Sequence, residues 1–294
     1  MEAKASNLQK VFVTGGSSDL IRSVIDLLPT KMFEVICLTR QHIEQKDRDI
    51  SWHVGDLLKP ETYGQLIRNC DVVLHAAAIT HTINEREYYD VNLEGTKKLL
   101  SVLEPNTKTR FIFISSRTAS EESGAYGKSK LMAEKVIKES VGNWLILRPS
   151  EIFGGSKSEG IDKAIESAML GGIQLCPAGV QTPMYPIHTQ DAARLIYQCG
   201  FVEKETNKIV HINGPLPYSF YNLIKSVSRI AGKRVLVIPI PKIMLLLIAQ
   251  LVKITKIDVG IVPDQVARLY STKQHEVVES TFITIEEFVK AKLT

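Results

Sequence analysis

Residues 11–28 read VFVTGGSSDLIRSVIDLL, and this stretch decides the fold. Residues 11–14 have the composition of a buried strand, and residues 21–28 repeat apolar side chains at helical spacing. The tight turn between them consists of Gly15, Gly16, Ser17, Ser18, Asp19 and Leu20. Backbone N–H groups at a helix N-terminus carry partial positive charge, and glycine lets an anion approach them closely. The turn therefore predicts a pyrophosphate site, although a plain glycine-rich turn would have the same sequence.

The first half of the chain continues this alternation of strand and helix. Further strand-like runs lie at residues 35–39, 72–76, 111–115 and 144–148. Each is almost continuously apolar, as expected for a strand covered by helices on both faces. Strands that alternate with longer helical patterns indicate βαβ units. We therefore predict an α/β protein with a Rossmann-type, doubly wound parallel sheet and a smaller, discontinuous C-terminal substrate domain.

The pattern changes after Pro149, where glycine pairs and a group of prolines interrupt the alternation. We place the dinucleotide-binding domain at residues 1–150. We expect residues 183–200 to complete it, because 187–197 are predicted to return to the main sheet as strand and helix. The substrate-binding region is then 151–294, mainly 151–182 and 201–294.

The composition is that of an ordinary soluble protein, with 44% hydrophobic and 23% charged residues among 294. Basic residues are dispersed and the net charge is only +4, so we expect no nucleic-acid partner. The four cysteines form no Cys-x-x-Cys pair, and we expect reduced thiols, no metal site and a cytoplasmic location. The N-terminus has no secretory signal pattern, and the longest apolar run, 243–252, is too short for a transmembrane segment.

A second motif carries the predicted chemistry. Tyr126 and Lys130 stand four apart in a helical stretch that continues to Ser140, so their side chains share one helix face. A tyrosine has a pKa near about 10, and a cation within about 4–6 Å lowers it toward working pH. Ser116 ends the preceding strand and can hydrogen-bond a substrate oxygen. Together these residues predict a proton-transfer centre that interconverts an alcohol and a ketone. A Tyr-x-x-x-Lys pair alone more often lies on the solvent-exposed face of a helix. Here the pair follows a predicted strand and Ser116, and this order favours a catalytic role.

The end of the second predicted strand indicates the cofactor. An NAD-binding sheet normally carries Asp or Glu there, which accepts hydrogen bonds from the adenosine ribose. This chain has Thr39 followed by Arg40. Since no carboxylate repels a 2′-phosphate and a guanidinium can pair with it, we expect NADP(H) to be favoured over NAD(H). A solvated surface arginine is the alternative interpretation of Arg40.

In this order the motifs resemble the extended branch of the short-chain dehydrogenase/reductase superfamily, the NAD-dependent epimerase/dehydratase group, over residues 10–215. The resemblance is carried by the turn at 15–21, Gly55-Asp-Leu57, DVVLHAAA at 71–78, YDVNLEGT at 89–96, FIFISS at 111–116, YGKSK at 126–130, LRP at 147–149 and IHTQD at 187–191. It implies Tyr126 as acid and base, Lys130 on the nicotinamide ribose and Ser116 on the reacting oxygen. It also implies cofactor contacts at Asp56, Leu57, Ala76, Ala77, Ala78, Asn92 and Pro149, and substrate contacts at Thr80, His81, Ser116 and Glu151. Relatives often form homodimers.

The chain departs from the family pattern at several points. Ser18 or Asp19 stands at the second glycine of the phosphate turn and Ile21 at the third, which we expect to push the helix outward and weaken cofactor binding. Tyr126 follows Ser116 by only ten positions, so the lid over the substrate is expected to be small. Glu151 stands where relatives often place an amide facing a diphosphate. A carboxylate there would repel phosphate, so either Glu151 points elsewhere or the substrate is not a nucleotide sugar.

Three functions remain open. The first is an enzyme on a sugar nucleotide, performing 4-epimerisation or 4-keto reduction. The second is an NADPH-dependent reductase of another ketone, such as a lipid-linked sugar, a steroid-like compound or a secondary metabolite. For that case the run 243–252 could dock the molecule or a membrane surface, although we expect a buried or dimer-facing helix. The third is a non-catalytic dinucleotide sensor or scaffold, favoured by the lost glycines and opposed by the complete set of Ser116, Tyr126 and Lys130.

Overall fold

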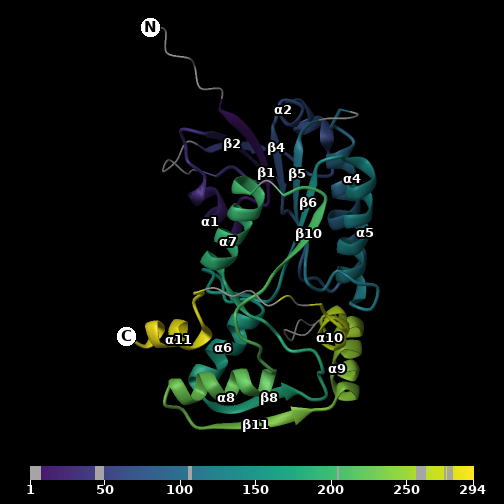
Figure 1. Ribbon diagram of the computed structural model, residues 1–294. Coiled ribbons are helices and arrows are strands. Elements are labelled where there is room, and N and C mark those ends of the chain that lie inside the picture. Colours follow the sequence, from purple (N-terminus) through teal and green to yellow (C-terminus); the bar gives the residue numbers. More distant parts are fainter. Residues whose placement is uncertain are drawn as a thin grey trace.

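A computed structural model describes residues 8–43, 50–104, 108–203, 205–255, 263–274, 276 and 281–294. The chain forms a larger part around one sheet and a smaller part beneath it, with the C-terminal helix at the side of the smaller part (Figure 1). The first seven residues, for which the sequence predicts no signal segment, lie outside the described residues.

The main sheet of the described residues has seven strands, all parallel, in the order β10-β6-β5-β4-β1-β2-β3. These strands are β1 (Gln9–Thr14), β2 (Phe33–Thr39), β3 (Ile50–Val54), β4 (Val72–His75), β5 (Arg110–Ile114), β6 (Trp144–Pro149) and β10 (Lys208–Ile212). The strand order reverses between β1 and β4, which is where doubly wound sheets bind nucleotides. The predicted fold class is confirmed.

Helices cover both faces of this sheet, as Figure 1 shows. One face carries α1 (Asp19–Leu27) and α7 (Thr189–Tyr197), and the other carries α2 (Gly64–Ile67), α4 (Gly95–Leu100) and α5 (Gly124–Ser140). Successive strand side chains point to opposite faces. Val11 and Val13 therefore pack with α1 and α7, whereas Phe12 packs with the α4 and α5 layer. The almost continuous apolar runs in the sequence follow from this double coverage.

The smaller part is built on a parallel strand pair, β8 (Gly172–Pro177) and β11 (Val235–Ile240). Its core joins this pair to α6 (Ile161–Leu170), α8 (Phe220–Ile230) and α11 (Ile285–Leu293). The helices α9 (Lys242–Thr255) and α10 (Pro263–Tyr270) pack on each other around Leu245, Ala249 and Val266. The remaining elements are short: η1 (Pro60–Thr62), α3 (Glu85–Glu87), η2 (Tyr88–Glu94), β7 (Ile152–Phe153), β9 (Ile187–His188) and η3 (Gln198–Val202).

Two expectations about the second half are wrong. Residues 187–197 add a helix, α7, to one face of the main sheet but no strand, because β9 has only two residues and pairs with β7 in a separate sheet. The strand that returns to the main sheet is β10, beside β6. For the run 243–252 only the buried alternative is wrong, since Leu245, Ala249 and Val252 are the only buried residues of α9; the dimer-facing alternative stays a prediction. No helix among the described residues is long and apolar enough to cross a membrane.

Candidate functional site

The predicted phosphate turn lies at the carboxyl end of β1, against the backbone that follows β4. Gly15 has φ +75°, and a Cβ there would lie 2.8 Å from the carbonyl carbon of Ala76. A Cβ on Gly16 would lie 2.9 Å from the sulfur of Cys37 in β2. The Thr14 hydroxyl accepts hydrogen bonds from the backbone N–H groups of Ala76 and Ala77, 3.2 and 3.1 Å away. Contact with the Ala76 backbone at Gly15 and with the Cys37 side chain at Gly16 excludes a side chain from both positions, and glycine there lets an anion approach the turn.

The departures from the glycine pattern have structural roles. Ser18 is the N-cap of α1, and its hydroxyl accepts a hydrogen bond from the backbone N–H of Ile21. Ile21 is buried in the core between α1 and the sheet. Asp19 opens α1 and accepts hydrogen bonds from the backbone N–H and hydroxyl of Ser156, at 2.7 and 2.9 Å. Although burial alone would raise the pKa of Asp19, these bonds hold it below its ordinary value. The turn is thus tied to the loop after β7, while Ser17 is exposed and Leu20 packs on the core.

The adenosine end of the predicted site lies beyond β2 and β3. Arg40 is exposed at the end of β2, and the Thr39 hydroxyl donates a hydrogen bond to the Gln41 carbonyl. Arg22 of α1 places its guanidinium carbon 5.8 Å from the Trp52 ring centroid, above the neighbouring strand β3. The sequence analysis did not predict Arg22 as a candidate cofactor residue, although its position one helical turn after Ser18 follows from the sequence.

The turn after β3 is held by a hydrogen bond to one of its own side chains. The Asp56 carboxylate accepts a hydrogen bond from the backbone N–H of Leu58, and Leu57 is buried. Ala76, Ala77 and Ala78 follow β4 and remain partly exposed, and Pro149 ends β6 as a buried residue. These residues surround the same sheet edge as the phosphate turn.

The proposed proton-transfer residues come together beside this edge. Tyr126 and Lys130 lie on α5 with 7% and 2% of their surface exposed. Ser116 follows β5, and its hydroxyl hydrogen-bonds the Tyr126 phenol and the Thr118 hydroxyl. The Lys130 ammonium donates a 2.7 Å hydrogen bond to the Ile114 carbonyl and lies 4.3 Å from the Phe113 ring centroid. Burial lowers the pKa of Lys130 to about 7, against the raising effect of Glu134.

The cation that acts on Tyr126 in this structure is Arg268, from α10. Its guanidinium carbon lies 4.6 Å from the Tyr126 ring centroid, and it pairs with Asp264 at 2.8 Å. Asp264 also accepts a hydrogen bond from the Tyr126 backbone N–H. Burial raises the pKa of the Tyr126 phenol, whereas Arg268 and the hydrogen bond from Ser116 lower it. Sequence reasoning missed Arg268 and Asp264, because no local motif links α10 to α5.

A buried hydrogen-bond network holds α5 in place. The Glu134 carboxylate accepts hydrogen bonds from Ser115 at 2.6 Å and from Arg148 at 2.9 and 2.6 Å. Asn92 uses its amide to bind both backbone groups of Ile79 and to donate to the Ser129 hydroxyl. Asn92 therefore joins the loop after β4 to α5.

Glu151 is paired with two cations. Its carboxylate lies 3.3 Å from Arg117 and 3.8 Å from Lys273, and it accepts a hydrogen bond from the Tyr185 backbone N–H. Arg117 is buried and also donates to the carbonyls of Pro183 and Gln274. Burial lowers the pKa of Lys273. Two cations thus neutralise the single carboxylate, which removes the expected repulsion of phosphate.

The loop with Thr80 and His81 also reaches this side. Arg268 donates a 3.2 Å hydrogen bond to the Thr80 carbonyl, and the Gln265 amide lies 3.1 Å from a ring nitrogen of His81. Both loop residues are exposed. The helix α10 therefore contacts both this loop and the Tyr126 ring.

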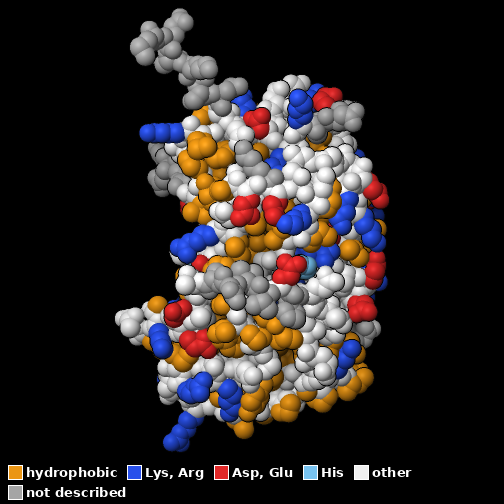
Figure 2. Space-filling view, in the orientation of Figure 1, with side chains coloured by type: hydrophobic (Ala, Val, Ile, Leu, Met, Phe, Trp, Pro, Cys, Tyr) orange, Lys and Arg blue, Asp and Glu red, His pale blue; other side chains and the backbone are white. Residues whose placement is uncertain are grey.

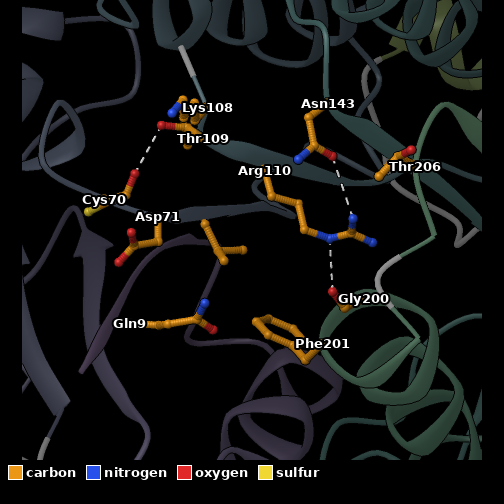
Figure 3. Close-up of a pocket in the computed structure, with 11 residues that line it drawn as sticks. Gln9, Cys70, Asp71, Lys108, Thr109, Arg110, Asn143, Gly200, Phe201 and Thr206 are labelled. Carbon is orange, nitrogen blue, oxygen red and sulfur yellow. Dashed lines mark hydrogen bonds between the residues drawn. The ribbon is translucent and has the colours of Figure 1, made fainter. Parts of the chain in front are cut away.

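A separate hollow of about 390 Å³ lies at the opposite, amino edge of the sheet, among residues that include Gln9, Asp71 and Arg110 (Figure 3). The Arg110 guanidinium points into it but donates to the carbonyls of Gly200, Cys199 and Glu205. This arginine therefore holds the chain beyond α7 against the sheet, and we assign the hollow no chemistry. Among the residues that the structure describes, no cluster of His, Cys, Asp or Glu could hold a metal ion.

Comparisons with known proteins show the family and the fold of this chain. Residues 11–200 match the model of the NAD dependent epimerase/dehydratase family. The 40 kDa subunit of mitochondrial NADH-ubiquinone oxidoreductase from Neurospora crassa is 22% identical over 238 residues, which cover 78% of this chain and 62% of that protein. UDP-glucose 4-epimerase from Vibrio cholerae is 26% identical over 172 residues, which cover 50% of this chain and 52% of that enzyme. This chain therefore spans between half and two thirds of these relatives.

The fold of a solved structure is also similar. It is dTDP-4-dehydrorhamnose reductase from Bacillus anthracis in complex with NADP, with a TM-score of 0.64 at 16% identity. The match covers 80% of this chain and 84% of that one.

Proposed function

Because the chain belongs to the NAD-dependent epimerase/dehydratase family, we propose that it interconverts the alcohol and ketone forms of a sugar nucleotide, with Tyr126 as acid and base. The reaction is either 4-epimerisation or 4-keto reduction. The observation that carries the proposal is the buried phenol of Tyr126, set between the Ser116 hydroxyl and the Arg268 guanidinium. Burial raises the pKa of the phenol overall, and these two neighbours partly offset that rise, so the phenol is held as a proton donor that both neighbours help to ionise.

The residues at the sheet edge fit a dinucleotide. A Cβ at Gly15 or Gly16 would collide with the Ala76 backbone or the Cys37 sulfur, so only glycine allows this tight turn directly before the N-terminus of α1, where an anion binds favourably. The Lys130 ammonium has three N–H donors, and one of them binds the Ile114 carbonyl. The other two would hold the nicotinamide ribose. When bound, the nicotinamide supplies or accepts the hydride.

The substrate side supports an anionic ligand. Arg268 contacts the Tyr126 ring and pairs with Asp264, while Arg117 and Lys273 both lie against Glu151, so three cations face two carboxylates. The excess of positive charge suits a diphosphate, and a relative named UDP-glucose 4-epimerase acts on such a compound. A non-nucleotide ketone is the second candidate, favoured by the exposed apolar residues of α9.

The phenol is tested by Tyr126→Phe. We expect turnover to fall by roughly 100-fold or more, because proton transfer by a positioned side chain contributes about 10²–10⁴-fold. Cofactor affinity should stay within a few-fold, since the hydroxyl acts mainly in the reaction. The matched control is Tyr221→Phe, which changes an exposed tyrosine on α8. Turnover of Tyr126→Phe at the wild-type level would contradict the mechanism.

The cofactor is tested by titrating the protein with NADPH and NADH while following nicotinamide fluorescence. We propose a preference for NADP(H), because Arg40 and Arg22 supply two cations near the end of β2 and Thr39 supplies no carboxylate. Arg40→Asp should move the preference toward NADH by about tenfold, one lost charge-assisted pair. Arg68→Asp, at the end of α2, is the control. Unchanged selectivity in Arg40→Asp would refute the assignment of Arg40.

Tight NAD that stays bound through purification would favour the epimerase over the reductase, because an epimerase recycles its cofactor. Exchangeable NADPH would favour the reductase. Consumption of NADPH with a 4-keto sugar nucleotide, and none with unsubstituted ketones, would then separate the two candidate substrate classes.

A further inference from the structure

The smaller part exposes an apolar face on three elements, the paired strands β8 and β11 and the helix α9 that follows β11. Among the described residues, twenty large apolar side chains are exposed, and ten of them lie on β8, β11 and α9. On the strand pair they are Ile173, Leu175, Leu236 and Ile238, and on α9 they are Ile243, Met244, Leu246, Leu247, Leu251 and Ile254. Only Pro241 separates β11 from α9, so the two sets are adjoining. We call these ten residues the apolar face.

The residues of the apolar face follow the periodicity of the strands and of the helix that carry them. In the strand pair Leu236 is opposite Ile173 and Ile238 is opposite Leu175, so all four point away from the core that α6 and α8 cover. On α9, Ile243, Leu247, Leu251 and Ile254 follow one another at helical spacing on the side opposite the buried Leu245, Ala249 and Val252. Single exposed apolar residues are ordinary, whereas a gathered set of this size indicates a binding surface.

The stretch of chain that carries most of the apolar face has charge of one sign. Residues 206–257 contain eight of the 36 basic residues of the chain and none of its 32 acidic residues. Lys233 and Arg234 are exposed immediately before β11, and Lys225 and Arg229 are exposed on α8. The lower end of the molecule in Figure 2 shows apolar side chains beside Lys and Arg. At the far end of α9, Lys253 pairs with Glu85 at 3.2 Å.

We propose that the apolar face docks the protein on the surface of an anionic phospholipid bilayer. Apolar side chains enter the boundary between headgroups and acyl chains, while flanking cations attract the negative lipid surface. The helix α9 lies on this surface and does not cross it. The smaller part is then held at the membrane surface.

The sign of the charge favours lipid over a second copy of the chain. A two-fold interface is self-complementary, so each copy would bring its own basic residues toward the same basic residues of the other. Like charges in contact are repulsive, and this stretch supplies no acidic residue to offset them. An anionic bilayer offers the opposite sign at high density.

The test is flotation of the full-length protein with two kinds of vesicle, phosphatidylcholine alone and an equal mixture of phosphatidylcholine and phosphatidylglycerol. We expect binding to the mixed vesicles that is several-fold stronger than to phosphatidylcholine, and weaker at 0.5 M salt by roughly tenfold because the attraction is screened. Absence of binding to the mixed vesicles would overturn the proposal.

Two variants divide the face into its apolar and its charged contribution. Ile243→Asn with Leu247→Asn should weaken binding to mixed vesicles by about tenfold or more, since two apolar side chains no longer enter the bilayer. Both side chains are at least 60% exposed, so circular dichroism and thermal unfolding should match the wild type. Lys233→Glu with Arg234→Glu should remove the preference for anionic vesicles.

Matched controls lie on the larger part. Met32→Asn with Val54→Asn changes two exposed apolar residues, and Lys98→Glu with Lys128→Glu changes two exposed lysines. These variants should float as the wild type does. Equal flotation of all variants would overturn the assignment of the face. So would self-association that Ile243→Asn with Leu247→Asn abolishes, measured by light scattering, if the wild type does not bind vesicles.

Discussion

The phenol of Tyr126 experiences two opposing effects. Burial raises its pKa, and the guanidinium of Arg268 lowers it. The sequence pairs Tyr126 with Lys130, but the Lys130 ammonium faces the Ile114 carbonyl and the Phe113 ring. Arg268 stands 142 positions after Tyr126, so no spacing rule could relate them. The proton-transfer residues could therefore be predicted from one helix and one strand end, whereas the cation that acts on the phenol depends on how a distant helix packs.

Removal of Arg268 should move the pH dependence of the reaction. In Arg268→Gln the pKa of Tyr126 rises, because the effect that lowers it is lost and burial remains. The phenolate then forms only at higher pH, so the acidic limb of kcat/KM for alcohol oxidation should shift to higher pH, with activity at pH 7 lower by roughly tenfold. The measurement is a pH profile of both proteins.

The control for this prediction is Arg268→Lys. It keeps a positive charge near the ring and should restore part of the profile. A uniform loss of activity in Arg268→Gln at every pH would instead mean that Arg268 only supports the packing of α10.

At the scale of elements, the sequence predicts a strand well when helices cover both of its faces. The predicted runs at 35–39, 72–76, 111–115 and 144–148 correspond to β2, β4, β5 and β6 within two residues at each end. The edge strand β3 escaped notice because Ser51 and His53 interrupt its apolar character. In the same way, β9 was expected in the main sheet because Ile187 is apolar. A strand of only two residues is too short for its sequence to indicate which neighbouring strand it pairs with.

The phosphate turn gives a test at this scale. Gly15→Ala should lower the free energy of unfolding by about 1–3 kcal/mol, because alanine is strained at φ +75° and its Cβ would meet the backbone of Ala76. Gly142→Ala places a Cβ where nothing lies within 4 Å, and it should change stability by less than about 0.5 kcal/mol. Urea unfolding of the two variants provides the measurement. Equal stability of the two would mean that the turn tolerates a side chain.

At the scale of the whole molecule, the family predicted from the sequence is confirmed, and so is the parallel sheet. The path of the second half was harder to predict, because after β6 the chain crosses between the two parts several times (Figure 1). Contacts that join distant segments hold this path together. The Asp191 carboxylate of α7 accepts a hydrogen bond from the Ile283 backbone N–H at 2.8 Å. Such pairings leave no periodic trace in a sequence.

The place of β10 beside β6 also has a consequence for synthesis of the chain. On the ribosome β6 is complete at Pro149, but the strand that covers its edge begins only at Lys208. At roughly 5–20 residues per second, that edge waits roughly 3–12 s for its neighbour. An uncovered strand edge is a template for pairing with other chains. The nascent protein therefore passes through an interval in which a chaperone, or any segment able to lie along β6, competes with its own later residues.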